Sequence, residues 1–71
     1  MQRYANLNGN SGVIAFEIGD TWIKIQFKTG SPYTYSYQKA GVTHVETMKV
    51  LAKNGRGLNS YIMRNCKFLY D

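Results

Sequence analysis

The sequence predicts an α+β domain in which a three-stranded antiparallel β-meander is followed by two helices packed on one face of the sheet. Two observations lead to this expectation. Apolar and polar residues alternate with a period of two through much of residues 13–37, as in half-buried strands. After Gly41 the apolar residues recur at helical spacing. Strands that come before helices favour a sheet covered on one side over an alternating α/β fold.

Residues 22–28 and 33–37 are expected to form the central hairpin. A turn over residues 29–31 would place Ile25 opposite Tyr35, with aromatic and aliphatic side chains on one face. The other face would carry Trp22, Lys24 and Lys28 and would be open to water or to a partner. Whether the tyrosines of residues 33–37 belong to the core or to a binding surface stays open, with packing favoured.

Residues 13–18 are the expected first strand, with Ile14, Phe16 and Ile18 on its core face. Either a two-residue turn at residues 19–20 or a four-residue loop keeps this face aligned with the central strand. Residues 1–12 are rich in Asn and Gly and are expected to be a flexible N-terminal segment. The single domain is therefore expected to span residues 13–71.

The first helix is indicated by Val45, Met48 and Ala52, which recur at helical spacing. Residues 43–46 have the form of a capping box, in which the Thr43 hydroxyl would bond a backbone amide of the first turn. Gly55 is expected to end this helix. A second helix is expected from about residue 58, with one apolar stripe formed by Leu58, Tyr61, Ile62, Cys66 and Leu69.

The charge of the chain favours an anionic partner. Nine Lys and Arg residues against four Asp and Glu residues give a formal net charge of +5, and such a surplus attracts nucleic acids or nucleotides. The single cysteine, Cys66, permits no disulfide framework, which favours a cytoplasmic location. No apolar run follows Arg3 and no stretch has the length of a membrane span, so we expect neither a signal peptide nor a membrane partner.

Catalysis finds little support in the sequence. His44 is the only histidine, and it stands beside a predicted helix start, where a surface imidazole is the ordinary explanation. The four acidic residues are scattered and form no evident acid pair or metal site. We therefore expect a protein that is not an enzyme and that needs no cofactor or metal.

The candidate residues for binding a nucleic acid or another anion are aromatic or basic and come from several parts of the chain. Arg56 lies between two glycines whose backbone amides could hold a phosphate, although a tight turn between helices is the stronger explanation. An exposed tryptophan between lysines is a plausible platform for a stacked base. The full candidate set is Trp22, Lys24, Lys28, Arg56 and Arg64.

Several short motifs resemble the KTSC domain, a family named after the C-terminal domain of some lysyl-tRNA synthetases and also found in short bacterial and phage-type proteins. The matching features are the glycine turn at residues 27–30, the Tyr-x-Tyr that follows it, and a glycine, an asparagine and an isoleucine at fixed spacing. These motif residues are Tyr33, Tyr35, Gly55, Asn59 and Ile62. The resemblance spans residues 13–62, but residues 38–41 stand where the family has Val-Pro. It implies the fold described above, and the family's link to a tRNA enzyme implies an RNA partner.

Three functions remain open at this point. The first is a small basic module that binds RNA or another nucleic acid. The second is an oligomeric protein that captures a nucleotide-like anionic ligand, and the third is a protein-interaction domain. A homo-oligomer is also expected, because the chain is small and because Trp22 and Val13 are predicted to be exposed beside one another.

Overall fold

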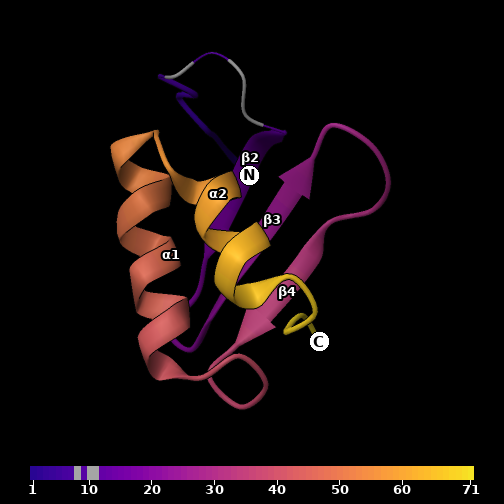
Figure 1. Cartoon of the computed structure of the whole chain (residues 1–71), viewed down its shortest axis with the longest axis vertical. Helices are drawn as coiled ribbons and strands as arrows, with labels where there is room; N and C mark the ends of the chain where they lie inside the picture. Colours follow the sequence, from indigo (N-terminus) through magenta and orange to yellow (C-terminus); the bar gives the residue numbers. More distant parts are fainter. Residues whose placement is uncertain (8, 10–11) are drawn as a thin grey trace.

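The computed structural model describes residues 1–7, 9 and 12–71 and confirms the α+β class (Figure 1). Its sheet has four antiparallel strands in the order β1-β2-β3-β4, rather than the three expected. Two helical segments, α1 and the continuous α2–η1, cover one face of this sheet (Figure 1). The elements are β1 (Gln2–Arg3), β2 (Val13–Ile18), β3 (Trp22–Phe27), β4 (Tyr33–Ser36), α1 (Val42–Asn54), α2 (Leu58–Tyr61) and the π-helical η1 (Ile62–Cys66).

The additional strand comes from the segment that was expected to be flexible. Gln2 pairs with Phe16 on the edge of β2, and the next residue, Tyr4, is 3% exposed. The Tyr4 amide donates to the Ile14 carbonyl at 3.0 Å, and its hydroxyl accepts from the Leu58 amide at 3.3 Å. The Asn- and Gly-rich composition predicted a flexible segment, but Tyr4 is buried and anchors the segment to the core. Residues 8, 10 and 11 of the segment lie outside the described residues.

The pairing of β3 with β4 differs from the expected register by two residues. Ile25 lies opposite Tyr33 rather than Tyr35, and Ile23 lies opposite Tyr35. A shift of two residues leaves every side chain on its original face, so the expected faces are correct although the partners are wrong. A longer loop causes the shift, and the Gln26 side-chain Nε2 donates to Gly30 O at 3.1 Å within this loop.

A β-bulge in β2 overturns the prediction that Ile14 faces the core. Val13 pairs with Phe27 and Ala15 with Gln26, so the register shifts across Ile14. Val13 is therefore 1% exposed and Ile14 is 45% exposed. Burial of Val13 also removes the exposed Trp22–Val13 pair on which the expected self-association rested. The other end of β2 follows the four-residue alternative, with Ile18 opposite Ile23.

The start of α1 differs from the predicted capping box. Gly41 is the N-cap residue, with φ of 98°, and no side chain caps the helix. Thr43 therefore lies inside the helix, where its carbonyl accepts from the Thr47 hydroxyl at 2.8 Å. Glu46 instead contacts Lys49 at 2.8 Å. The predicted end is confirmed, because Gly55 closes the helix in a left-handed conformation, with φ of 79°.

The core lies between the sheet and the two helical segments. Leu58, Ile62 and Cys66 are fully buried, as the predicted apolar stripe required. Beyond η1 the chain returns to the sheet, and the Asp71 amide donates to Thr34 O at 2.7 Å on the outer edge of β4. The last residues therefore lie beside the strand that would otherwise end the sheet (Figure 1).

The two faces of β3 should respond differently to truncation. Ile25 is fully buried under the helices, so Ile25→Ala should lower the free energy of unfolding by about 2 to 5 kcal/mol. Lys24 lies between the buried Ile23 and Ile25 and so points to the other face of the sheet; Lys24→Ala should therefore have a much smaller effect. Urea denaturation of both variants measures the difference, and equal losses would contradict the assignment of the faces.

Two glycines with similar backbone conformations provide a second test. Gly30 and Gly55 have φ of 82° and 79°, but a Cβ on Gly55 would stand 2.7 Å from Ala5 Cβ, whereas nothing lies within 4 Å of one on Gly30. Gly30→Ala should cost about 1 to 2 kcal/mol for the left-handed conformation alone. Gly55→Ala should cost about 1 to 3 kcal/mol more, because it also overpacks the contact with the N-terminal segment. Similar denaturation midpoints for the two variants would mean that this contact is loose.

Candidate functional site

The predicted Trp22 platform lies on the sheet face without helices, at the β2–β3 turn. The Lys24 amino group stands 5.9 Å from the centre of the Trp22 ring. The indole rests directly on Gly19, where any Cβ would fall 2.0 Å from it. Lys24 pairs across the strands with Glu17, so the positive charge of this face is partly offset. The structure therefore brings Trp22 and Lys24 together, but on a mixed-charge surface.

The predicted arginines lie elsewhere. Arg56 is exposed in the turn between α1 and α2, and Arg64 is exposed on η1. Both belong to the helical layer, whereas Trp22 and Lys24 alternate along β3 with the buried Ile23 and Ile25 and so face away from that layer. The five predicted residues thus form no single surface, and only Lys28 borders the pocket described below.

The glycine turn around Arg56 has a structural role. The Gly55 amide donates to Leu51 O at 3.0 Å, and the Gly55 carbonyl accepts from the Leu7 amide at 2.7 Å. Asn59 lies half-buried, with its side-chain oxygen close to Gly12. Together with the buried Ile62, the spaced motif residues hold the helices to the N-terminal part of the chain. This arrangement favours the helix-to-helix turn over a phosphate loop.

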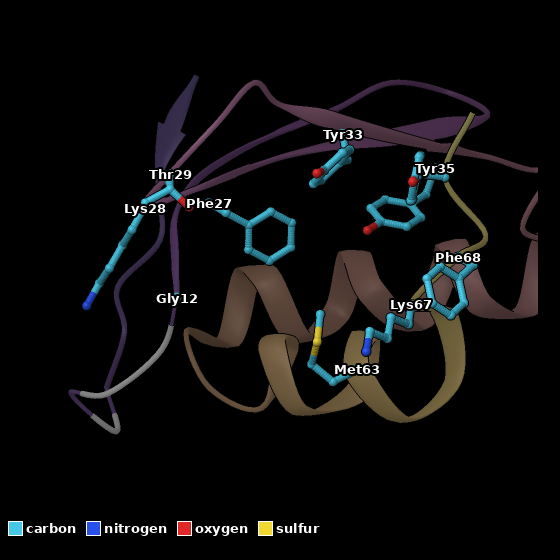
Figure 2. Close-up of a pocket in the computed structure, with 10 residues that line it drawn as sticks. Gly12, Phe27, Lys28, Thr29, Tyr33, Tyr35, Met63, Lys67 and Phe68 are labelled. Carbon is cyan, nitrogen blue, oxygen red and sulfur yellow. The ribbon is translucent and has the colours of Figure 1, made fainter.

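A pocket of about 410 Å³ opens between the β3–β4 hairpin and the C-terminal helical segment. Figure 2 shows Phe27, Tyr33 and Tyr35 along its sheet side, with Met63, Lys67 and Phe68 along its helical side. Its size falls in the range of pockets that hold small ligands, and such pockets combine apolar walls with a few polar groups. Its lining residues are Gly12, Phe27, Lys28, Thr29, Tyr33, Tyr35, Met63, Lys67, Phe68 and Tyr70.

Aromatic rings dominate the walls of this pocket. The ring centres of Tyr33 and Tyr70 are 4.6 Å apart, at an angle of 34°. Phe27 lies 5.7 Å from Tyr33. Tyr33 remains 41% exposed and Phe68 74% exposed, although large aromatic side chains usually find cover. Exposed rings around a concave site can stack on a flat ligand.

The three tyrosines of the hairpin have different positions. Tyr35 is 1% exposed and belongs to the core, while Tyr33 forms part of the pocket wall. Tyr37 lies outside β4 and its hydroxyl bonds the Glu46 carboxylate. That hydrogen bond raises the pKa of Tyr37, and Lys49 together with this bond lowers the pKa of Glu46. The preference for packing is therefore confirmed for Tyr35 and for the half-buried Tyr37, which also packs against the core, but not for the exposed Tyr33.

Positive charge is present at two places along the pocket. Lys28 lies at the end beside Gly12, with its amino group directed away from the rings, and Lys67 lies on the helical side (Figure 2). The Lys67 amino group stands 5.4 Å from the centre of the Phe68 ring. The described residues that line the pocket include no carboxylate. The site thus combines aromatic walls with uncompensated lysines, which suits a flat anionic ligand.

Tyr35 contributes a hydroxyl group to the residues that line the pocket. Burial raises the pKa of Tyr35 to about 12, with smaller contributions from Cys66, Tyr33 and Tyr70. Within the described part of the chain, this hydroxyl makes no hydrogen bond. Every side-chain oxygen or nitrogen that is fully buried there does have a hydrogen-bond partner, so the Tyr35 oxygen is not fully buried. The oxygen must therefore be the part of Tyr35 that reaches the pocket, where it stays protonated and can bond a ligand.

Sequence reasoning missed most of this pocket. Phe27 was assigned correctly to the core side, but Met63, Lys67 and Phe68 were not candidates. These three side chains lie outside the buried stripe of Leu58, Ile62 and Cys66, so helical spacing placed them on the exposed side, and only the tertiary fold brings them beside the β3–β4 hairpin. The available signal was the pair of aromatic residues, Phe68 and Tyr70, that flank the last residue of the predicted stripe.

Comparison with protein families, characterised proteins and solved structures found no match. Among the residues that the structure describes, no three or more His, Cys, Asp or Glu side chains gather as a metal site would require. The described helices are also too short or too polar to cross a membrane.

The ionisation of Tyr35 predicts a pH dependence of stability. An unfolded phenol ionises near pH 10, whereas the folded one stays protonated to about pH 12, so stability should fall as the pH rises between these values. Tyr35→Phe should make this fall less steep. Denaturant melts from neutral to alkaline pH measure it, and below about pH 9 the difference between the two proteins should stay constant. Parallel curves throughout would contradict the raised pKa.

Proposed function

We propose that the protein is a small module that binds single-stranded RNA or another single-stranded nucleic acid through the pocket between the β3–β4 hairpin and η1. One unpaired base would enter the pocket, and the neighbouring phosphates would meet Lys28 and Lys67. The single observation that carries the proposal is the combination of exposed rings and unpaired lysines around one cavity. Stacking on aromatic side chains and contact with lysines are the two recurrent ways of holding a single strand.

The basic character of the whole chain supports this proposal. The formal net charge of +5 would draw a polyanion to the surface before the base is seated. The resemblance to the KTSC domain points toward RNA as well, and we propose that the chain is a KTSC-like domain of bacterial or phage type. We further propose a binding role without catalysis and a cytoplasmic location, which the single buried cysteine supports.

The pocket is offered in place of the Trp22 surface for two physical reasons. Trp22 rests on Gly19 and is half-buried, so less of its ring is open to a base than the 74% exposed Phe68 presents. Lys24 also faces Glu17 across the strands, whereas Lys67 lines a site without carboxylates. A base and its phosphate therefore find better partners in the pocket.

Binding of a labelled single-stranded RNA, measured by fluorescence anisotropy at two salt concentrations, tests the proposal. Phe68→Ala should weaken binding by about 1 to 3 kcal/mol, because a stacking surface is lost, without changing the salt dependence. Lys67→Gln should instead flatten the plot of log K against log salt by about 0.7, the share of one phosphate contact. Both side chains are exposed, so neither change should disturb the fold.

Trp22→Ala and Lys24→Gln are the matched controls, because they remove an aromatic ring and a lysine from the opposite face of the sheet. They should leave RNA binding unchanged. If these two variants bind RNA more weakly while the pocket variants bind it normally, the binding site lies on the face without helices instead. Tight binding of free nucleotides with poor binding of strands would favour nucleotide capture by an oligomer. Absence of both at low salt would exclude the proposal and leave the protein-interaction function.

A further inference from the structure

We infer that the Tyr35 hydroxyl selects the ligand of the pocket by its hydrogen-bonding edge, so that a nucleobase is accepted and an apolar ring of the same shape is rejected. This inference rests on the proposed function and names the contact that would determine base preference. It concerns a residue that is itself almost wholly buried, and it is therefore distinct from the stacking by exposed rings.

The first step in the argument is the position of the hydroxyl. Tyr35 lines the pocket although only 1% of its surface is exposed. Tyr70 packs edge-on against its ring at 6.4 Å, and the fully buried Cys66 is close enough to influence its ionisation. The ring is thus held by its neighbours, so the hydroxyl cannot swing away to find another partner. A fixed polar group is what selection by hydrogen bonding requires.

The second step is the cost of covering this hydroxyl. Without a ligand, water can enter the pocket and bond the oxygen. A ligand that fills the pocket displaces that water and must replace its hydrogen bond, or the hydroxyl is left unsatisfied in apolar surroundings. A site of this kind discriminates strongly against an analogue that lacks the matching group. Apolar walls alone would distinguish little between flat rings of equal size.

The third step is the chemistry of the partner. A protonated phenol both donates and accepts a hydrogen bond, so it matches the carbonyl, ring nitrogen and amino groups on the edges of bases. The aromatic walls fit the flat faces of a base, and Lys28 and Lys67 fit the attached phosphates. A free fatty chain or an apolar peptide side chain would satisfy the walls and leave the hydroxyl without a partner.

The test uses short single strands that carry one base at the centre and abasic sites elsewhere. The central group is adenine, cytosine, guanine, thymine or difluorotoluene, which has the shape of thymine but forms only weak hydrogen bonds. The full-length chain should bind the thymine strand at least about fivefold more tightly than the difluorotoluene strand, as expected for one hydrogen bond lost in a closed site. Tyr35→Phe should bind the two strands about equally.

Tyr37→Phe is the matched control. It removes a hydroxyl just beyond β4 and outside the pocket lining, where the hydroxyl bonds Glu46, so it should keep the preference of the unaltered chain. Retention of the preference in Tyr35→Phe, or its absence in the unaltered chain, would overturn the inference while leaving strand binding intact. If no strand binds, including an RNA that carries a base at every position, the result would instead count against the proposed function.

Discussion

The fold depends on covering one apolar face of a small sheet with very few helical residues. Ile23 and Ile25 of the central strand are fully buried, and α1 and the short α2–η1 segment are the only helical elements that the structure describes over them. A core this small leaves little margin, so segments outside the regular elements also contribute. Tyr4 is the clearest example, because its hydroxyl accepts the Leu58 amide and joins the first strand to the last helical segment.

The same shortage of helix explains why the pocket exists. The α2–η1 segment is short, and beside it part of the apolar face of the β3–β4 hairpin stays uncovered where Phe27 and Tyr33 line the pocket. The chain then returns along the edge of the sheet rather than across this face. Aromatic surface is thus left partly uncovered because of the length of the elements. The proposed binding site is this uncovered aromatic surface, which a larger protein would bury in its core.

The sequence predicted the class of the fold well, because alternation and helical spacing are set by which side chains must be buried. A register change of two residues is invisible to alternation, so the Ile25–Tyr33 pair was missed while its face was correct. The bulge at Ile14 and the strand before Tyr4 were also missed, since both arise from tertiary contacts rather than from local pattern. For the candidate site, only Lys28, Tyr33 and Tyr35 were named in advance. The remainder depends on how the C-terminal segment lies beside the hairpin, which is a tertiary contact that helical spacing does not predict.

The contact between Asp71 and β4 has a consequence for how this sheet meets other chains. An outer strand with free amides and carbonyls is a template for unwanted pairing, and short or covered edges reduce that hazard. Here the Asp71 amide occupies Thr34 O, and the Ser36 hydroxyl donates to the Asp71 carboxylate at 2.8 Å. A carboxylate is thereby held beside the edge of β4, where it would repel an approaching acidic chain. Protection against aggregation and completion of the sheet therefore depend on the same few residues.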